Sequence, residues 1–119
     1  MSLLLSLALI VASPPSSDLG AAATRPPSLR RLALVAGANR AAERPSLRYA
    51  VRDAERFTRV MTAMGGVAPS DATLLKEPNP KAFMDALAAL SSKAADARRS
   101  AARVEVLVYY SGHADEQGL

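Results

Sequence analysis

Residues 104–113 read Val104-Glu105-Val106-Leu107-Val108-Tyr109-Tyr110-Ser111-Gly112-His113. The first seven are mostly β-branched, apolar or aromatic, a composition typical of a strand buried in a parallel sheet. Ser111-Gly112 is a turn pair, so the strand is expected to end there. In open α/β sheets, binding sites lie just beyond the carboxyl ends of the strands. The chain's only histidine, His113, therefore falls where such a fold places its chemistry.

Upstream of this strand, the hydrophobic pattern predicts two more strands and two helices. The apolar run Leu32–Gly37 predicts a first strand, and Ala72–Leu75 predicts a short second one. Apolar residues at three- and four-residue intervals predict helices over about 47–64 and 80–99. The second helix is expected to begin at Asn79-Pro80, a favourable cap and first-turn pair. Seven residues form the predicted buried stripe of the first helix: Leu47, Ala50, Val51, Ala54, Phe57, Met61 and Met64.

The order strand, helix, strand, helix, strand predicts an α/β fold with a parallel sheet and right-handed crossovers. The length of 119 residues suits one small domain. The formal net charge is +4, but the basic residues alternate with acidic ones and lack interleaved aromatic residues. This pattern favours a solvated face over a nucleic-acid interface.

The residue types also exclude several classes of site. The chain has no cysteine, which excludes disulfides, thiolate metal sites and a cysteine nucleophile within these residues. With a single histidine and no cysteine, we expect no metal site. We expect no cofactor either.

The N-terminus predicts a leader rather than a folded element. The apolar run Leu3–Ala12 is shorter than the roughly 18 residues needed to span a membrane. Its length is typical of the hydrophobic core of a signal peptide. We therefore expect residues 1–30 to be a signal-peptide-like leader with a Pro/Ser-rich linker, and residues 31–119 to be the domain of an exported periplasmic or extracellular protein. The alternative is a disordered leader on a cytoplasmic protein.

His113 is the one strong candidate for chemistry. A histidine titrates near neutral pH and is suited to take and return a proton. The alternative is a capping histidine that bonds a loop carbonyl. Ser111 is too close in sequence to His113 for a triad, and the chain has no Gly-x-Ser-x-Gly motif. The residues alone therefore predict a site that holds a base but no nucleophile.

Three segments resemble the caspase-like cysteine peptidases, the family of caspases, metacaspases and their bacterial relatives. They are Leu32–Asn39, Leu47–Ala54 and Val108–His113. The first resembles the family's first strand, the second resembles the start of its first helix, and the third resembles its tyrosine-rich strand ending in Ser-Gly-His. The resemblance covers residues 31–119 in the family's order. It implies a three-layer caspase-like fold of which this chain holds the N-terminal half, so that the domain is truncated.

The resemblance also implies roles for individual residues. His113 matches the catalytic histidine, which assists a cysteine in attacking a peptide carbonyl. Ala114 stands where the family usually has a glycine whose backbone N–H helps to hold the oxyanion, and alanine keeps that N–H. Arg48 lies near the arginine that binds the acidic substrate residue in caspases; the alternative is that Arg48 belongs to a solvated face. Asp53 fits a structural residue of the helix start. Metacaspase-like relatives prefer basic residues, so the substrate preference stays open.

The family's nucleophile is a cysteine at the end of the next strand, and the chain ends before that strand. We therefore expect part of a caspase-like cysteine endopeptidase, which is inactive alone and acts on a peptide or protein substrate only when it is completed. One alternative is a non-catalytic interaction module that pairs its exposed edge strand with a partner chain. Another is an unrelated small α/β binding domain. We expect no nucleic-acid partner and no membrane span.

Overall fold

The computed structural model describes residues 28–114. It contains three strands and two helices: β1 (Leu29–Gly37), α2 (Ala50–Ala63), β2 (Val67–Lys76), α3 (Pro80–Ala97) and β3 (Arg103–Ser111). The strands are parallel and lie in the order β2-β1-β3. The predicted α/β fold with a parallel sheet is confirmed.

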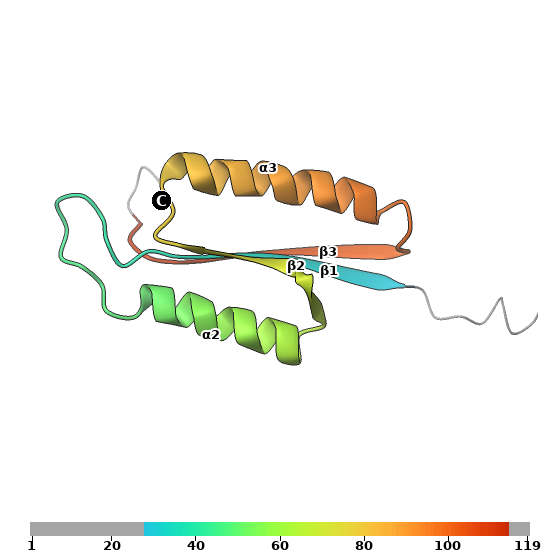
Figure 1. The fold of residues 1–119 in the computed structure, drawn as a ribbon, viewed down its shortest axis with the longest axis horizontal. Coiled ribbons are helices and arrows are strands. Elements are labelled where there is room, and N and C mark those ends of the chain that lie inside the picture. The colour runs from blue at the N-terminus through green and yellow to red at the C-terminus, as the bar shows by residue number, and fades with distance from the viewer. Residues whose placement is uncertain (1–27, 115–119) are drawn as a thin grey trace, which may run out of the picture.

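The two helices cover opposite faces of the sheet and make a three-layer structure (Figure 1). Consecutive side chains of a strand point to opposite faces, so β1 contributes to both layers. Leu32 and Leu34 pack with Leu90 of α3. Ala33 and Val35 of the same strand pack with residues on the α2 face. These four β1 side chains are at most 1% exposed, which makes β1 the centre of the core.

Strands β1 and β2 are both longer than their apolar runs. β1 begins at Leu29, three residues before the predicted Leu32, because its early arginines find acidic partners on neighbouring strands. β2 begins at Val67 rather than at Ala72. The pairing of β1 with β2 is irregular there, since Arg31 lies opposite Val67 but Ala33 lies opposite Ala72. Sequence periodicity does not reveal such an irregularity.

Helix α2 begins at Ala50, three residues later than predicted. The backbone N–H of Leu47 donates to the Asn39 carbonyl at 2.7 Å, which keeps Leu47 in the loop. The Asn39 side-chain oxygen accepts from the Val51 N–H at 3.2 Å. It thereby provides a partner for an N–H group of the first helical turn, which has none within the helix. Leu47 and Met64 lie outside the helix and are 37% and 81% exposed, so their predicted place in the buried stripe is wrong.

Helix α3 begins as predicted. The Asn79 side chain accepts from the Ala82 N–H at 2.7 Å, and Pro80 is the first helical residue. Proline suits this position because its missing N–H would have had no partner within the helix. Leu90, Ala94 and Ala97 form the buried face of α3.

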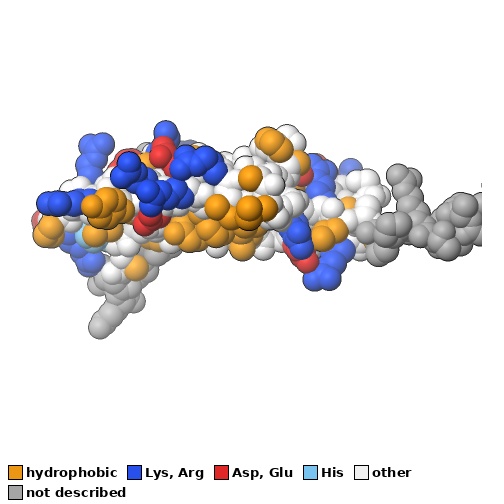
Figure 2. Space-filling model, turned by 90° about the horizontal axis from the view of Figure 1, so that it is seen from below, with side chains coloured by type: hydrophobic (Ala, Val, Ile, Leu, Met, Phe, Trp, Pro, Cys, Tyr) orange, Lys and Arg blue, Asp and Glu red, His pale blue; other side chains and the backbone are white. Residues whose placement is uncertain are grey.

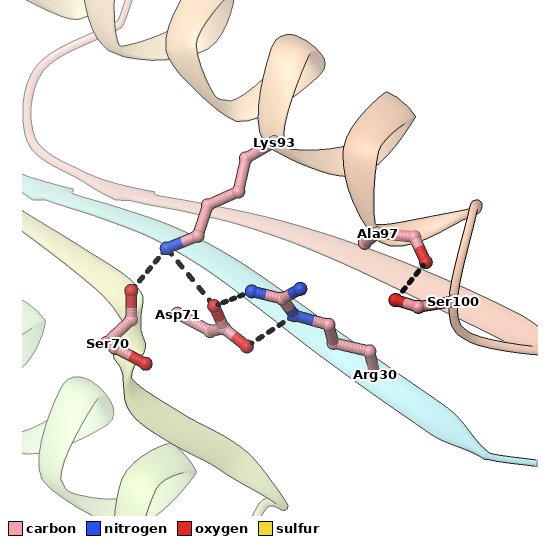
Figure 3. Close-up of polar contacts among 6 residues, drawn as sticks. All are labelled: Arg30, Ser70, Asp71, Lys93, Ala97 and Ser100. Atoms are coloured by element: carbon pink, nitrogen blue, oxygen red, sulfur yellow. Dashed lines mark hydrogen bonds and ion pairs between the residues drawn. The ribbon is translucent and has the colours of Figure 1, made fainter.

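A carboxylate in the α3 layer joins three elements (Figure 3). Asp71 of β2 is 6% exposed and accepts two hydrogen bonds from Arg30 of β1, at 2.8 and 2.9 Å. Lys93 of α3 lies 3.1 Å from the same carboxylate and also donates to the Ser70 carbonyl. The hydrogen bonds from Arg30, opposed by burial and assisted by Lys93, lower the pKa of Asp71 to about 2.

Strand β3 is an edge strand of the sheet that residues 28–114 form. Helix α3 packs mainly on β1 and covers little of β3. Val106 and Val108 are therefore 47% and 48% exposed. The strand itself is confirmed, but its expected burial is wrong for these two side chains.

Candidate active site

The carboxyl ends of β1 and β3 bring two loops together. Gly37 pairs with Ser111, and the next N–H, of Ala38, donates to the Ser111 carbonyl at 2.9 Å. A Cβ atom at position 37 would lie 2.6 Å from the Ala50 carbonyl oxygen and 2.8 Å from the Ala54 Cβ. Glycine at position 37 thus lets the start of α2 approach the end of β1.

His113 follows β3 on a compact turn. The Tyr110 hydroxyl donates to the His113 carbonyl at 3.1 Å. A side chain at position 112 would overlap the Tyr110 ring, so glycine is required for this geometry. The tyrosine and the glycine together fix the backbone that carries the histidine. The His113 side chain lies partly exposed at this edge of the sheet.

The His113 ring is held by the loop that follows β1. Its Nε2 atom lies 3.1 Å from the Pro45 carbonyl oxygen. A carbonyl oxygen only accepts, so we assign the ring proton to Nε2. In the neutral ring, Nδ1 then carries the lone pair and accepts protons. This arrangement suits a general base, although a capping histidine would make the same bond to a loop carbonyl.

A pocket of about 210 Å³ lies beside the turn, between the start of α2 and the end of β3. Seven residues line it: Leu47, Arg48, Tyr49, Ala50, Asp53, Ser111 and Gly112. Arg48 and Asp53 therefore line one pocket. A positive and a negative side chain thus lie beside Gly112, the residue before His113. Figure 2 views the molecule from the α2 side, where basic and hydrophobic side chains lie close together.

The structure brings the predicted site residues to one end of the sheet. Ala114 follows His113, and its carbonyl accepts from Arg44 Nη1 at 3.3 Å. Arg48 is exposed and lines the pocket beside Gly112. Sequence reasoning missed Pro45, because no spacing rule indicates which loop carbonyl will meet a histidine 68 residues away.

A larger cavity, of about 320 Å³, lies toward the amino ends of β1 and β3. It is lined by Arg31, Leu32, Met61, Val67, Glu105, Val106 and Leu107. Its walls are mostly apolar, and its charged groups, Arg31 and Glu105, pair with each other at 2.6 Å. Size alone therefore does not mark the reactive site, and we place the candidate site at His113.

The described residues contain no group of three or more His, Cys, Asp or Glu side chains able to hold a metal ion. Neither helix between residues 28 and 114 is long and apolar enough to cross a membrane. Residues 1–27 of the predicted leader and linker lie outside the described residues, whereas Leu29 and Arg30 belong to β1.

A comparison with family models matched the caspase domain to residues 30–119. The chain belongs to the caspase domain family. Searches of curated proteins and of solved structures found no match. Membership of the caspase domain family accounts for the three-layer α/β arrangement and makes the alternative of an unrelated α/β domain wrong. At the level of the family, the chain is caspase-like, and the peptidases of this family act on proteins.

Proposed function

We propose that this chain supplies the histidine half of a caspase-like cysteine endopeptidase site, with His113 as the acid and base. The observation that carries the proposal is the bond of 3.1 Å between Nε2 and the Pro45 carbonyl, beside a pocket at the carboxyl edge of the sheet. That bond leaves Nδ1 as the atom that accepts a proton. Family membership supports a base at this place over a cap, because the fold belongs to cysteine peptidases.

The reaction needs a thiolate, which forms when a neighbouring base removes the proton of a thiol. Nδ1 of His113 takes the thiol proton as the sulfur attacks the peptide carbonyl, and later gives it to the leaving amine. The 119 residues contain no cysteine, so the nucleophile has to come from a polypeptide segment outside them. We therefore propose that the chain as given is inactive alone. Cleavage of a peptide by the pure protein, persisting in the His113→Ala variant, would contradict both statements.

The experiment that tests the function begins with the coding DNA beyond codon 119. If it encodes a further strand that ends in cysteine, the longer chain should cleave peptides. His113→Ala in that chain should then lower the turnover rate by about 10²–10⁴-fold, the usual contribution of a general acid or base. Met84→Ala, at an exposed position on α3, serves as the matched control and should leave the rate unchanged. Full activity of His113→Ala would refute the proposed role.

The backbone N–H of Ala114 is the proposed oxyanion donor. This N–H belongs to the His113–Ala114 peptide group, whose carbonyl accepts from the Tyr110 hydroxyl at 3.1 Å, and the next carbonyl, of Ala114, accepts from Arg44. In an active longer chain, Ala114→Gly keeps the N–H and should keep most of the activity. Ala114→Pro removes the N–H and should lower the turnover rate by about 10²–10³-fold, the usual cost of one oxyanion donor. Equal activity of the two variants would exclude this donor.

Arg48 is the proposed substrate-binding residue, and it would favour an acidic side chain in the pocket. Asp53 lines the same pocket and favours a basic one. Arg48→Ala and Asp53→Asn, compared on matched peptides with an acidic or a basic residue before the cleaved bond, separate the two preferences. If Arg48 binds the substrate, its loss should raise KM for the acidic peptide alone.

Export is a further part of the proposal, on the strength of the run Leu3–Ala12. Its test is a fusion of residues 1–30 to a reporter enzyme that is active only outside the cytoplasm. An inactive fusion would favour the cytoplasmic alternative.

A second candidate function is a non-catalytic module that binds a partner through β3. The observation in its favour is the half-exposed pair Val106 and Val108 on an edge strand. Such an edge offers unpaired backbone groups beside apolar side chains, which is what an added strand requires. A folded, soluble monomer at high concentration, measured by analytical ultracentrifugation, would count against this candidate.

A further inference from the structure

Glu77 follows the last residue of β2 and has an unusual backbone conformation. Its φ angle is 53°, in the left-handed region that glycine adopts without penalty and other residues rarely adopt. Its N–H donates to the Gly37 carbonyl at 2.8 Å, so the residue sits directly beside the end of β1. A residue other than glycine is strained in this backbone conformation, so contacts with the surrounding structure have to compensate for the strain.

The Glu77 carboxylate provides these contacts. One oxygen accepts from the Asn39 N–H at 2.9 Å, and the other accepts from the Arg40 N–H at 3.3 Å. Hydrogen bonds to an ionised carboxylate are stronger than neutral ones. Glu77 thereby fastens the first residues of the β1–α2 loop to the end of β2.

Asn39 passes this constraint to the rest of the loop. Its side-chain oxygen accepts from the Val51 N–H at 3.2 Å, and its carbonyl accepts from the Leu47 N–H at 2.7 Å. Both ends of the segment 40–46 are therefore held at Asn39. Pro45 lies in this closed segment, and its carbonyl is the one that accepts from His113 Nε2.

We propose that Glu77 is a positioning residue that fixes the β1–α2 loop so that the Pro45 carbonyl holds the His113 ring with Nδ1 as the proton acceptor. The catalytic value of this orientation rests on the proposed function of His113. Glu77 lies at the end of β2 and acts through Asn39 and the loop rather than on the reacting atoms.

The single histidine makes the proposal measurable without peptidase activity. In a protein labelled with ¹⁵N and ¹³C, His113 gives the only imidazole signals in the spectrum. At alkaline pH, the wild type should show a protonated Nε2 and an unprotonated Nδ1. It should also show a nuclear Overhauser effect between the ring and Pro45. Absence of that effect in the wild type would overturn the proposal.

The test variant is Glu77→Gly, because glycine keeps the positive φ at no steric cost and removes both acceptor oxygens. We expect a folded protein that loses the effect between the His113 ring and Pro45. The matched control is Glu43→Gly, since Glu43 lies in the same loop with a φ of 58°. The control should keep the effect.

Three results would overturn the proposal. The first is a nuclear Overhauser effect between the His113 ring and Pro45 that survives in folded Glu77→Gly. The second is loss of this effect in both Glu77→Gly and the control Glu43→Gly. The third applies if Glu77→Gly does not fold, and is an effect at full strength in Glu77→Gln. Glu77→Gln keeps one acceptor oxygen, so a weakened effect is the supporting result there. Failure of the catalytic proposal is a separate outcome, because it appears only as retained activity of His113→Ala in a longer chain.

Discussion

Replacing Asp71 with asparagine tests how the ion cluster of β1, β2 and α3 contributes to stability. The change keeps the shape of the side chain and removes its charge. The pKa of Asp71 falls from the usual 3.8 to about 2, and the first cause is its hydrogen bonds to Arg30. At about 1.36 kcal/mol per pKa unit, this difference corresponds to about 2 kcal/mol of stability at pH 7. Arg30 and Lys93 are 38% and 39% exposed, so solvent screening makes this an upper value.

The sign of the pH dependence follows from the lowered pKa. The contribution is fully present above pH 3.8 and is lost as the pH falls from 3.8 toward 2. Urea unfolding followed by circular dichroism should show Asp71→Asn up to about 2 kcal/mol less stable than wild type at pH 7, and up to about 1 kcal/mol less stable at pH 3. Asp85→Asn is the control, because Asp85 is 65% exposed in its pair with Lys81. It should cost less than about 0.5 kcal/mol. Equal costs for the two variants at pH 7, or a cost for Asp71→Asn that does not depend on pH, would refute the reasoning.

Three further predictions concern the core, a helix start and the strand end beside the site. Leu34→Ala removes a fully buried side chain and should cost about 2–5 kcal/mol in urea unfolding; a cost below about 1 kcal/mol would contradict its place at the centre of the core. Asn79→Ala removes the cap of α3 and should cost about 1 kcal/mol, with faster hydrogen exchange in the first turn of that helix; unchanged exchange there would mean that the cap is not used. Gly37→Ala forces a Cβ against the Ala50 carbonyl and should cost about 1–3 kcal/mol, with chemical-shift changes concentrated at the start of α2; a variant as stable as wild type would show that α2 approaches β1 less closely.

The elements were predictable because their signals are local. An unbroken apolar run indicates a strand, and Asn79-Pro80 indicates a helix start, without reference to the rest of the chain. The boundaries of β1 and β2 were less predictable, because they depend on partners elsewhere in the chain. Arg30 in β1, for example, pairs with Asp71, which lies 41 residues away.

The candidate site was predictable only in part, for the same reason. His113 was predictable because it is the chain's only histidine and directly follows a predicted strand. The family resemblance gave Arg48 and Ala114 their proposed roles. Neither Pro45 nor Glu77 carries a sequence signal, since one acts through a backbone carbonyl and the other through contacts with backbone N–H groups. Contacts made by the main chain depend on the fold and not on residue type.

The place of β1 in the sheet also affects how the chain folds. β1 is synthesised first of the three strands, yet both of its neighbours come later, and Leu29 pairs with Arg103. Every strand pairing is thus distant in sequence, a topology that slows folding because long loops must close first. On the ribosome, the hydrophobic run 32–36 is synthesised before α2 and α3, which cover the two faces of β1, and before β3, which pairs with its edge. Until these elements have been made, the nascent chain exposes an apolar segment of the kind that makes folding intermediates prone to aggregate.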